Sequence, residues 1–328
     1  MEKPGILLFE TIYKEKIWGG EKINSILKKD FSPRTNCGET WELSGVEGDI
    51  SIVKNGKDKG KSLLDVITLY REQLMGKLVY DSYGDSFPLL IKFIDAAQDL
   101  SIQVHPNDEL AKKRHNSLGK TEMWYVLQAD PDASLITGFN QILNKELFLK
   151  KFNAGDLESI LNREKALSGD VFFVPAGTVH TIGKGLLIAE IQQTLDITYR
   201  IYDFDRVDEN GNKRELHVEE ALDAFDFKFY DQYKSPYSLT ENEVSTLVES
   251  EYFTTNLIPC KGSIEKTYKN LDSFVIYTVV EGSLTISTKD SDPLNLQLGD
   301  VALIPACMDN LFIQSSGCKV LETYIEKP

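Results

Sequence analysis

Two histidines, a glutamate and a glutamine stand where they could form a metal site. Gln103 and His105 lie two apart in LSIQVHP, a pattern typical of a short strand, so their side chains share a face. Glu122 opens a second apolar run, EMWYVL, after a helical stretch that starts at NDELAKK, and His180 ends GDVFFVPAGTVH. Two imidazoles and a carboxylate are a ligand set for a divalent metal, provided that the first two strands are neighbours. The alternative for His180 is a buried structural histidine.

Composition limits the partners of this chain. It has 328 residues, 41% of them hydrophobic and 27% charged, and a formal net charge of −15. An acidic protein of this kind is a poor match for nucleic acid or an anionic membrane, although a local cationic pocket could still hold a small anion. We find no apolar run of membrane-spanning length and no signal-peptide core, so we expect a cytoplasmic protein. The four scattered cysteines are expected to be free thiols.

Lys92 interrupts an otherwise apolar run, FPLLIKFIDA, which predicts a buried strand. A cation inside such a strand is costly unless it faces a wet cavity or a partner. The alternative is an edge strand from which the Lys92 side chain reaches solvent.

Strand patterns with Gly, Pro and Asp turns dominate the chain and predict a sandwich or barrel. Helices are expected in SLLDVITLYREQLMG, with Ser62 as N-cap and Gly76 as its end, and in KELFLKKFN, DLESILN and ELHVEEALDAF. We therefore predict a mainly β fold with a few helices inserted or packed alongside.

An internal repeat supports two related halves. GDVFFVPAGTVH aligns without gaps to GDVALIPACMDN, and Asn310 stands where the first copy has His180. The repeat suggests two related β-barrels, of which only the first keeps a metal ligand.

The spacing of Gly169, Pro175, Gly177 and His180 resembles the second motif of the cupin family. A sharp Gly/Pro turn aims one imidazole into a barrel that has room for an ion or a small ligand. The helical stretch between His105 and Glu122 departs from the usual first cupin motif. The resemblance implies two cupin-type β-barrels (jelly rolls): a catalytic cupin domain with the metal site in residues 1–230, and a degenerate cupin domain without metal in residues 231–328.

The whole pattern resembles type I mannose-6-phosphate isomerase (phosphomannose isomerase), in its short bacterial form. The segments that carry the resemblance are IWGG, GETWELS, LSIQVHP, GKTEMWYVL, VPAGTVH and IQQTLDITYRIYDFDR. The resemblance covers most of the chain.

This resemblance implies one Zn²⁺ per chain, bound by Gln103, His105, Glu122 and His180. An amide oxygen, two imidazoles and a carboxylate would also hold Fe²⁺, Mn²⁺ or Co²⁺. His115 and His217 lie in charged helical surroundings and are expected to face solvent.

The implied substrate is a sugar phosphate, and the resemblance points to Lys92, Lys120 and Arg200 as its cationic lining. Arg200 is also the implied catalytic arginine; its alternative is an ion pair with Asp196 or Asp203. Trp18 either walls the sugar pocket or belongs to the core.

The implied reaction interconverts mannose 6-phosphate and fructose 6-phosphate through an enediol. It needs a Lewis acid and a base that moves a proton between C2 and C1. Glu190 and Lys120 are both candidates for the base, and Glu190 could instead orient a metal ligand.

Two other functions remain open. One is a non-catalytic sugar-phosphate-binding paralogue, against which the intact ligand set and Arg200 argue. The other is an Fe²⁺ dioxygenase, which the cluster of Lys92, Lys120 and Arg200 disfavours. We expect no nucleic-acid or membrane partner, and a monomer or weak homodimer.

Overall fold

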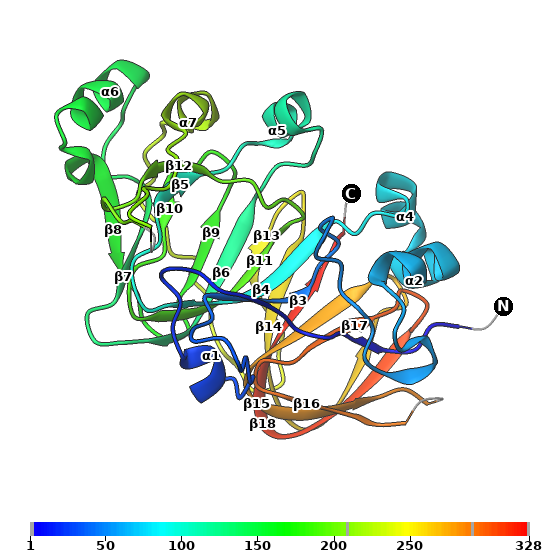
Figure 1. The fold of residues 1–328 in the computed structure, drawn as a ribbon. Helices are drawn as coiled ribbons and strands as arrows, with labels where there is room; N and C mark the ends of the chain where they lie inside the picture. The colour runs from blue at the N-terminus through cyan, green and yellow to red at the C-terminus, as the bar shows by residue number, and fades with distance from the viewer. Residues whose placement is uncertain (1–2, 208–209, 290–291, 327–328) are drawn as a thin grey trace. The chain divides into compact units, whose positions relative to one another are not determined.

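The computed structural model describes residues 3–207, 210–289 and 292–326. Its named strands pair in antiparallel fashion throughout, in three sheets (Figure 1). The fold is mainly β with short helices, as predicted. Among the described residues, no helix is both long and apolar enough to cross a membrane.

The chain divides into two compact units, each built from separate segments. One unit comprises residues 1–12, 41–91 and 236–328, and the other comprises residues 13–40 and 92–235. The sequence predicts a single boundary after residue 230, close to the division at residue 235. However, the segments 1–12 and 41–91 belong to the same unit as the C-terminal residues. A single cut in the chain therefore does not separate the two units.

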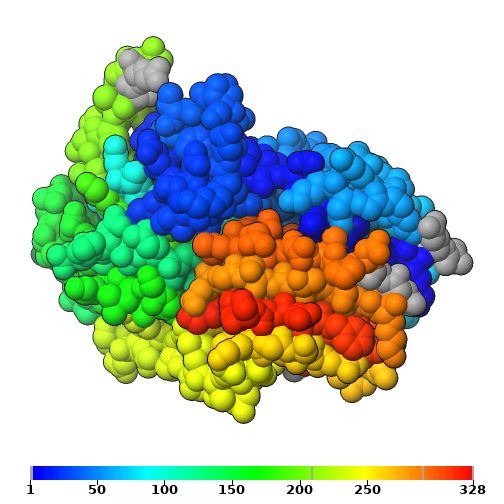
Figure 2. Space-filling view, turned by 90° about the horizontal axis from the view of Figure 1, so that it is seen from below, coloured from blue at the N-terminus to red at the C-terminus, as the bar shows by residue number. Residues whose placement is uncertain are grey.

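The first unit holds a seven-stranded sheet in the order β1-β17-β15-β18-β14-β13, with β16 paired to β15. In Figure 2, the red band of β18 lies between the orange of β15 and the yellow of the strands that precede β15 in the chain. The strands are β1 (Leu7–Leu8), β13 (Ser245–Glu249), β14 (Thr254–Thr267), β15 (Val275–Ser287), β16 (Leu294–Gln297), β17 (Val301–Ile304) and β18 (Asn310–Tyr324).

The core of this unit contains a hydrogen-bonded carboxylate as well as apolar side chains. Glu322 is 2% exposed, and its Oε1 accepts a hydrogen bond from the Tyr268 hydroxyl at 2.6 Å. Lys266 Nζ lies 3.0 Å from the same oxygen, and Asn256 Nδ2 donates to Oε2 at 3.1 Å. These partners compensate the burial of the Glu322 charge.

The second unit contains a five-stranded sheet in the order β12-β5-β10-β7-β8. Its strands are β5 (Ile102–Val104), β7 (Ser134–Phe139), β8 (Leu161–Lys165), β10 (His180–Thr181) and β12 (Tyr199–Tyr202). A six-stranded sheet has the order β2-β3-β4-β11-β6-β9. Its strands are β2 (Ile12–Lys14), β3 (Glu39–Leu43), β4 (Leu89–Ala96), β6 (Glu122–Ala129), β9 (Val171–Val174) and β11 (Leu186–Gln193).

The helices are short, and their ends follow the expected capping chemistry. Ser62 caps α2 through a capping box with Asp65, and the predicted helix breaks at Arg71 before it ends at Gly76. The helices are α1 (Lys22–Ser25), α2 (Leu63–Tyr70), α3 (Glu72–Met75), α4 (Lys77–Tyr83), α5 (Asp108–His115), α6 (Lys145–Asn153) and α7 (Val218–Ala224). The 3₁₀ helices are η1 (Gly56–Asp58) and η2 (Leu157–Ile160).

The two repeated sequence segments take the same local structure. Gly169 and Gly299 have φ angles of 90° and 89°, values that favour glycine. Each glycine donates its N–H to a valine carbonyl, Val126 at 2.8 Å and Val279 at 2.9 Å. The following strands, β9 and β17, lead to β10 at His180 and β18 at Asn310. The repeat predicted from sequence is therefore also a structural repeat.

Candidate metal site and catalytic cavity

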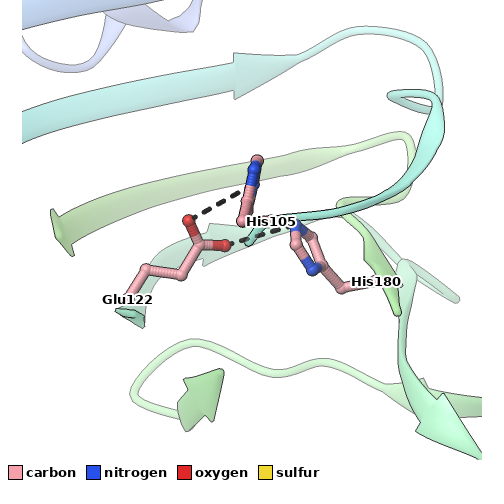
Figure 3. A group of neighbouring side chains, drawn as sticks. All are labelled: His105, Glu122 and His180. Atoms are coloured by element: carbon pink, nitrogen blue, oxygen red, sulfur yellow. Dashed lines mark ion pairs between the residues drawn. The ribbon is translucent and has the colours of Figure 1, made fainter. Parts of the chain in front are cut away.

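His105, Glu122 and His180 converge on one point of the second unit (Figure 3). One ligand atom from each lies within 4.8 Å of the others. Glu122 Oε1 is 3.3 Å from His180 Nε2, and Oε2 is 3.8 Å from His105 Nε2. Each of the three residues is 1% exposed. Ligand atoms at these separations can share a divalent ion.

Three strands from two sheets position these side chains. Gln103 lies on β5, His105 directly follows it, and His180 opens β10, which pairs with β5 so that His180 is opposite Gln103. Glu122 opens β6 of the six-stranded sheet. The sequence-based expectation that the strand before His105 and the strand of Glu122 are neighbours is therefore wrong. These strands, β5 and β6, belong to different sheets, and the side chains meet across the space between them.

Backbone carbonyls orient both imidazoles. His105 Nδ1 lies 2.8 Å from the Ile197 carbonyl oxygen, and His180 Nδ1 lies 2.8 Å from that of Thr178. A carbonyl can only accept, so Nδ1 carries the proton and Nε2 keeps its lone pair. Both Nε2 atoms face Glu122. The rings are thus held as metal-ligating tautomers.

Burial also keeps these imidazoles neutral. It lowers the pKa of His180 to about 4, and it holds the pKa of His105 well below its ordinary value, with a further contribution from the Lys120 charge. Neutral imidazole is the form that binds a metal. Protons therefore compete weakly for these two ligands near neutral pH.

The Glu122 carboxylate lacks the hydrogen bonds that usually compensate a buried charge. Neither oxygen has a well-aligned donor among the described residues, although Lys120 Nζ forms an ion pair with Oε2 at 2.9 Å. Burial raises the pKa of Glu122 to about 7, while the Lys120 charge opposes this shift. A bound cation would satisfy both oxygens, so the residues present fit a divalent metal.

Gln103, the fourth ligand expected from the sequence, lies beside both imidazoles. Its Nε2 lies 3.2 Å from His180 Nε2 and 3.5 Å from His105 Nε2. A half-turn of the amide group would place Oε1 at the same point, where it could ligate a metal.

A chain of alternating charges leads away from the ligands. Lys120 Nζ is 3.1 Å from His105 Nε2 and 3.9 Å from Glu190 Oε1. Lys92 Nζ is 3.3 Å from the same Glu190 oxygen and 3.9 Å from Glu39 Oε2. Trp124 Nε1 donates to Glu190 Oε2 at 3.0 Å, which fixes the carboxylate.

The ion pairs outweigh burial for both central members of this chain. Burial alone would lower the pKa of Lys92, but the charges of Glu190 and Glu39 raise it above its ordinary value. Burial alone would raise the pKa of Glu190, but the charges of Lys120 and Lys92 lower it. Lys92 is 3% exposed on β4, a strand with neighbours on both sides. The edge-strand alternative for Lys92 is therefore wrong.

A cavity of about 90 Å³ adjoins the ligands, and its lining is rich in charge. Gln103 and Trp18 both line it, and Trp18, 4% exposed, also packs in the apolar core of this unit. Five basic and three acidic side chains line the cavity: Lys16, Lys92, Lys120, Arg200 and Arg214, with Glu39, Glu190 and Asp196. The excess of cations suits an anionic ligand.

Arg200 is held by backbone rather than by an acidic partner. Its Nη1 donates to the Glu215 carbonyl at 2.9 Å, and its Nε is buried without a hydrogen bond among the described residues. The alternative expected from the sequence, an ion pair between Arg200 and an aspartate, is not found among the described residues. Asp203 pairs with Arg206 and Arg214 instead. Burial and the Arg214 charge lower the pKa of Arg200.

Sequence reasoning missed Arg214, Lys16 and Glu39 as cavity residues. Lys16 Nζ forms an ion pair with Glu39 Oε1 at 3.2 Å. Glu39 lies in the GETWELS segment, whereas Arg214 stands in a polar loop without a recognisable pattern. The other histidines are not among these ligands: His115 is exposed and bonds to the Tyr199 hydroxyl at 2.7 Å, and the partly exposed His217 accepts a hydrogen bond from the Arg200 backbone N–H at 3.2 Å.

Comparisons with known proteins agree with this geometry. The family model for the catalytic domain of type I phosphomannose isomerase matches residues 6–140, and that for the mannose-6-phosphate isomerase cupin domain matches residues 243–325. A Bacillus subtilis relative described as the putative mannose-6-phosphate isomerase YvyI is 37% identical over 97% of this chain and 98% of its own. The chain belongs to the type I phosphomannose isomerase family.

Further members of the family show the same likeness. Mannose-6-phosphate isomerase ManA of Bacillus subtilis is 38% identical over 84% of this chain and 85% of its own. The Streptococcus mutans mannose-6-phosphate isomerase is 37% identical over 91% of this chain and 92% of its own. A crystal structure of the mannose 6-phosphate isomerase from Bacillus subtilis superposes with a TM-score of 0.87 at 35% identity, covering 98% and 99% of the two chains.

Proposed function

We propose that this chain interconverts mannose 6-phosphate and fructose 6-phosphate with one Zn²⁺, held by Gln103, His105, Glu122 and His180. The observation that carries the proposal is a buried ligand set whose neighbours Gln103 and Lys120 line a cavity with five basic side chains. Ligands of this type suit a Lewis-acid metal, and the cationic lining suits a sugar phosphate.

Zn²⁺ in this set would supply a Lewis acid that polarises the substrate carbonyl and stabilises enediolate charge. Two features of the chain support the ligand assignment. Both imidazoles present Nε2 in the neutral form, and the Glu122 oxygens lack other well-aligned donors in the described part of the chain.

The cavity has a buried end and an accessible end. The Lys92 and Lys120 side chains are 4% and 6% exposed, whereas Arg214 is 28% exposed and Arg200 is half-buried. We assign the phosphate to the arginine end, where a guanidinium can form paired hydrogen bonds with it. A cavity of about 90 Å³ is small for a ligand site, so the arginines must move to admit substrate.

Glu190 is the group that we assign as the base. The two lysines lower its pKa and keep it ionised at neutral pH, and Trp124 fixes its orientation. Lys120, which touches both Glu122 and His105, would hold positive charge beside the developing enediolate. Arg200 would add charge from the other side, and Trp18 would wall the sugar.

Three further expectations remain proposals. The C-terminal domain predicted over residues 231–328 would be metal-free and structural, with Asn310 in place of a ligand. The protein would be a monomer or weak homodimer, and it would work in the cytoplasm.

A coupled assay for fructose 6-phosphate formed from mannose 6-phosphate tests the proposal. Metal-free protein should be inactive, Zn²⁺ should restore turnover, and His105→Ala should lose both bound zinc and activity. His115→Ala is the matched control, because His115 is exposed and lies apart from the ligands. A folded, zinc-loaded protein that binds mannose 6-phosphate without turnover would instead indicate a sugar-phosphate-binding paralogue.

A further inference from the structure

Two of the four cysteines face each other across neighbouring strands of the first unit. Cys260 on β14 pairs directly with Cys318 on β18 in the strand register. Residues opposite each other in an antiparallel pair have Cα atoms about 4.5–5.5 Å apart. That separation falls within the roughly 4.4–6.8 Å that a disulfide bond requires. The backbone therefore already has the spacing of a disulfide, while both thiols are reduced in this structure.

The two side chains also share one environment. Both residues pack in the same apolar core, with Cys260 1% and Cys318 5% exposed. The interaction between the two thiols raises the pKa of Cys260 and lowers the pKa of Cys318 below its ordinary value. Cys318 is thus the better source of thiolate, which is the reactive form.

The strand geometry around the pair is irregular and gives access from the surface. The β14–β18 register shifts between Cys260 and Gly262, next to the pair. Ser315, within hydrogen-bonding reach of the Cys318 thiol, lines a surface hollow of about 510 Å³ together with Gly262. A bulge disrupts the ladder locally, so the strands beside the pair can open more readily than a regular ladder.

We propose that Cys260 and Cys318 are a modification site at which a low-molecular-weight disulfide forms a reversible intrachain disulfide bond. The Cys318 thiolate attacks one sulfur of the reagent, forms a mixed disulfide and releases one thiolate. Cys260 then loses its proton and attacks the Cys318 sulfur, which releases the second thiolate. The protein loses two protons and two electrons, and the reagent takes them up and is reduced to two thiols.

This inference is independent of the isomerase reaction, because it uses no residue of the metal site or the cavity. Its structural consequence is a covalent link between β14 and β18. Such a link restricts the unfolded chain between residues 260 and 318 and should stabilise the fold.

The test treats the full-length protein with 2-hydroxyethyl disulfide and then denatures it in an alkylating reagent. Reduced protein should take up four alkyl groups, one on each cysteine, and oxidised protein two. Proteolysis should yield one linked peptide that contains Cys260 and Cys318. Dithiothreitol should reverse the change, and the oxidised protein should melt several degrees higher. Uptake of four alkyl groups after treatment, or any other linked pair, would overturn the proposal.

Single variants test the order of attack. Cys260→Ser should trap a mixed disulfide on Cys318, whereas Cys318→Ser should leave Cys260 unmodified. The reverse pattern would overturn the assignment of Cys318 as the attacking thiol. Cys307→Ser is the matched control, because Cys307 is partly exposed, lies outside the pair and should leave the linked peptide unchanged.

Discussion

Gln103 on β5 lies directly opposite Arg200 on β12 and, on its other side, directly opposite His180 on β10. Side chains in such a row share one face of the sheet. The row places Arg200 and His180 two strand spacings apart, which is about 10 Å. A sugar phosphate can therefore contact the metal ligands and the arginine at the same time.

Replacing Arg200 by alanine should impair turnover without removing the metal. We expect kcat/KM to fall by about 10²–10³-fold, because the charge that stabilises the enediolate and holds the phosphate is lost. Steady-state kinetics and metal analysis of the same preparation check this. Arg163→Ala is the control, because Arg163 is an exposed arginine paired with Glu158. Unchanged kcat/KM in Arg200→Ala would remove Arg200 from the reaction.

The two candidate bases can be separated by following the substrate C2 hydrogen in heavy water. Glu190→Gln should keep its zinc and bind substrate, yet lose exchange of that hydrogen, with kcat lower by about 10²–10⁴-fold. Lys120→Met should slow turnover but retain measurable exchange. If Lys120→Met loses exchange and Glu190→Gln keeps it, Lys120 is the base.

Lys92→Met should destabilise the fold. The change removes the cation between Glu190 and Glu39 and leaves each buried carboxylate with fewer partners, at a cost of about 3 kcal/mol. Urea denaturation measures this as a lower midpoint. Lys165→Met, at an exposed lysine, should leave the midpoint nearly unchanged. Equal midpoints for Lys92→Met and the parent would show that Lys92 contributes nothing to stability.

The Asp203 cluster predicts a pH-dependent contribution to stability. Burial alone would raise the pKa of Asp203, but hydrogen bonds from Arg214 and Arg206 lower it below 3.8. A group with a depressed folded pKa stabilises the protein above its unfolded pKa and loses that effect as the pH falls through the folded pKa. Asp203→Asn should therefore cost about 2 kcal/mol at pH 7.

Melting temperatures of the two proteins across pH test this expectation. The gap between Asp203→Asn and the parent should be constant near neutral pH and should close only below about pH 4, near the ordinary Asp pKa. Asp132→Asn, at an exposed carboxylate, should show no gap. A gap that persists at the lowest pH would exclude the ionised Asp203 as its source.

The local spacing of residues in the sequence was enough to find the candidate metal ligands. It did not predict how the strands that carry them are arranged. The two-residue period correctly places Gln103 and His105 near one point, and the Gly/Pro turn correctly brings His180 there. Whether β5 and β6 are neighbours or belong to different sheets depends on long-range pairing, which no local pattern encodes.

The same limit explains the other differences. An apolar run with one lysine is compatible with an edge strand or with a strand beside a cavity, and only the neighbours of β4 decide between them. Arg214 follows no periodic pattern. The grouping of residues 1–12 with the C-terminal unit rests on pairs such as Leu7 with Leu303, nearly 300 residues apart.

β5 has only three residues, yet both of its edges are paired, and its middle residue is Gln103. Slipping this strand by one position would turn Gln103 toward the apolar side and bring Ile102 or Val104 to face the metal ligands. A misregistered β5 would therefore lose the candidate metal site, which exists in only one alignment of this strand.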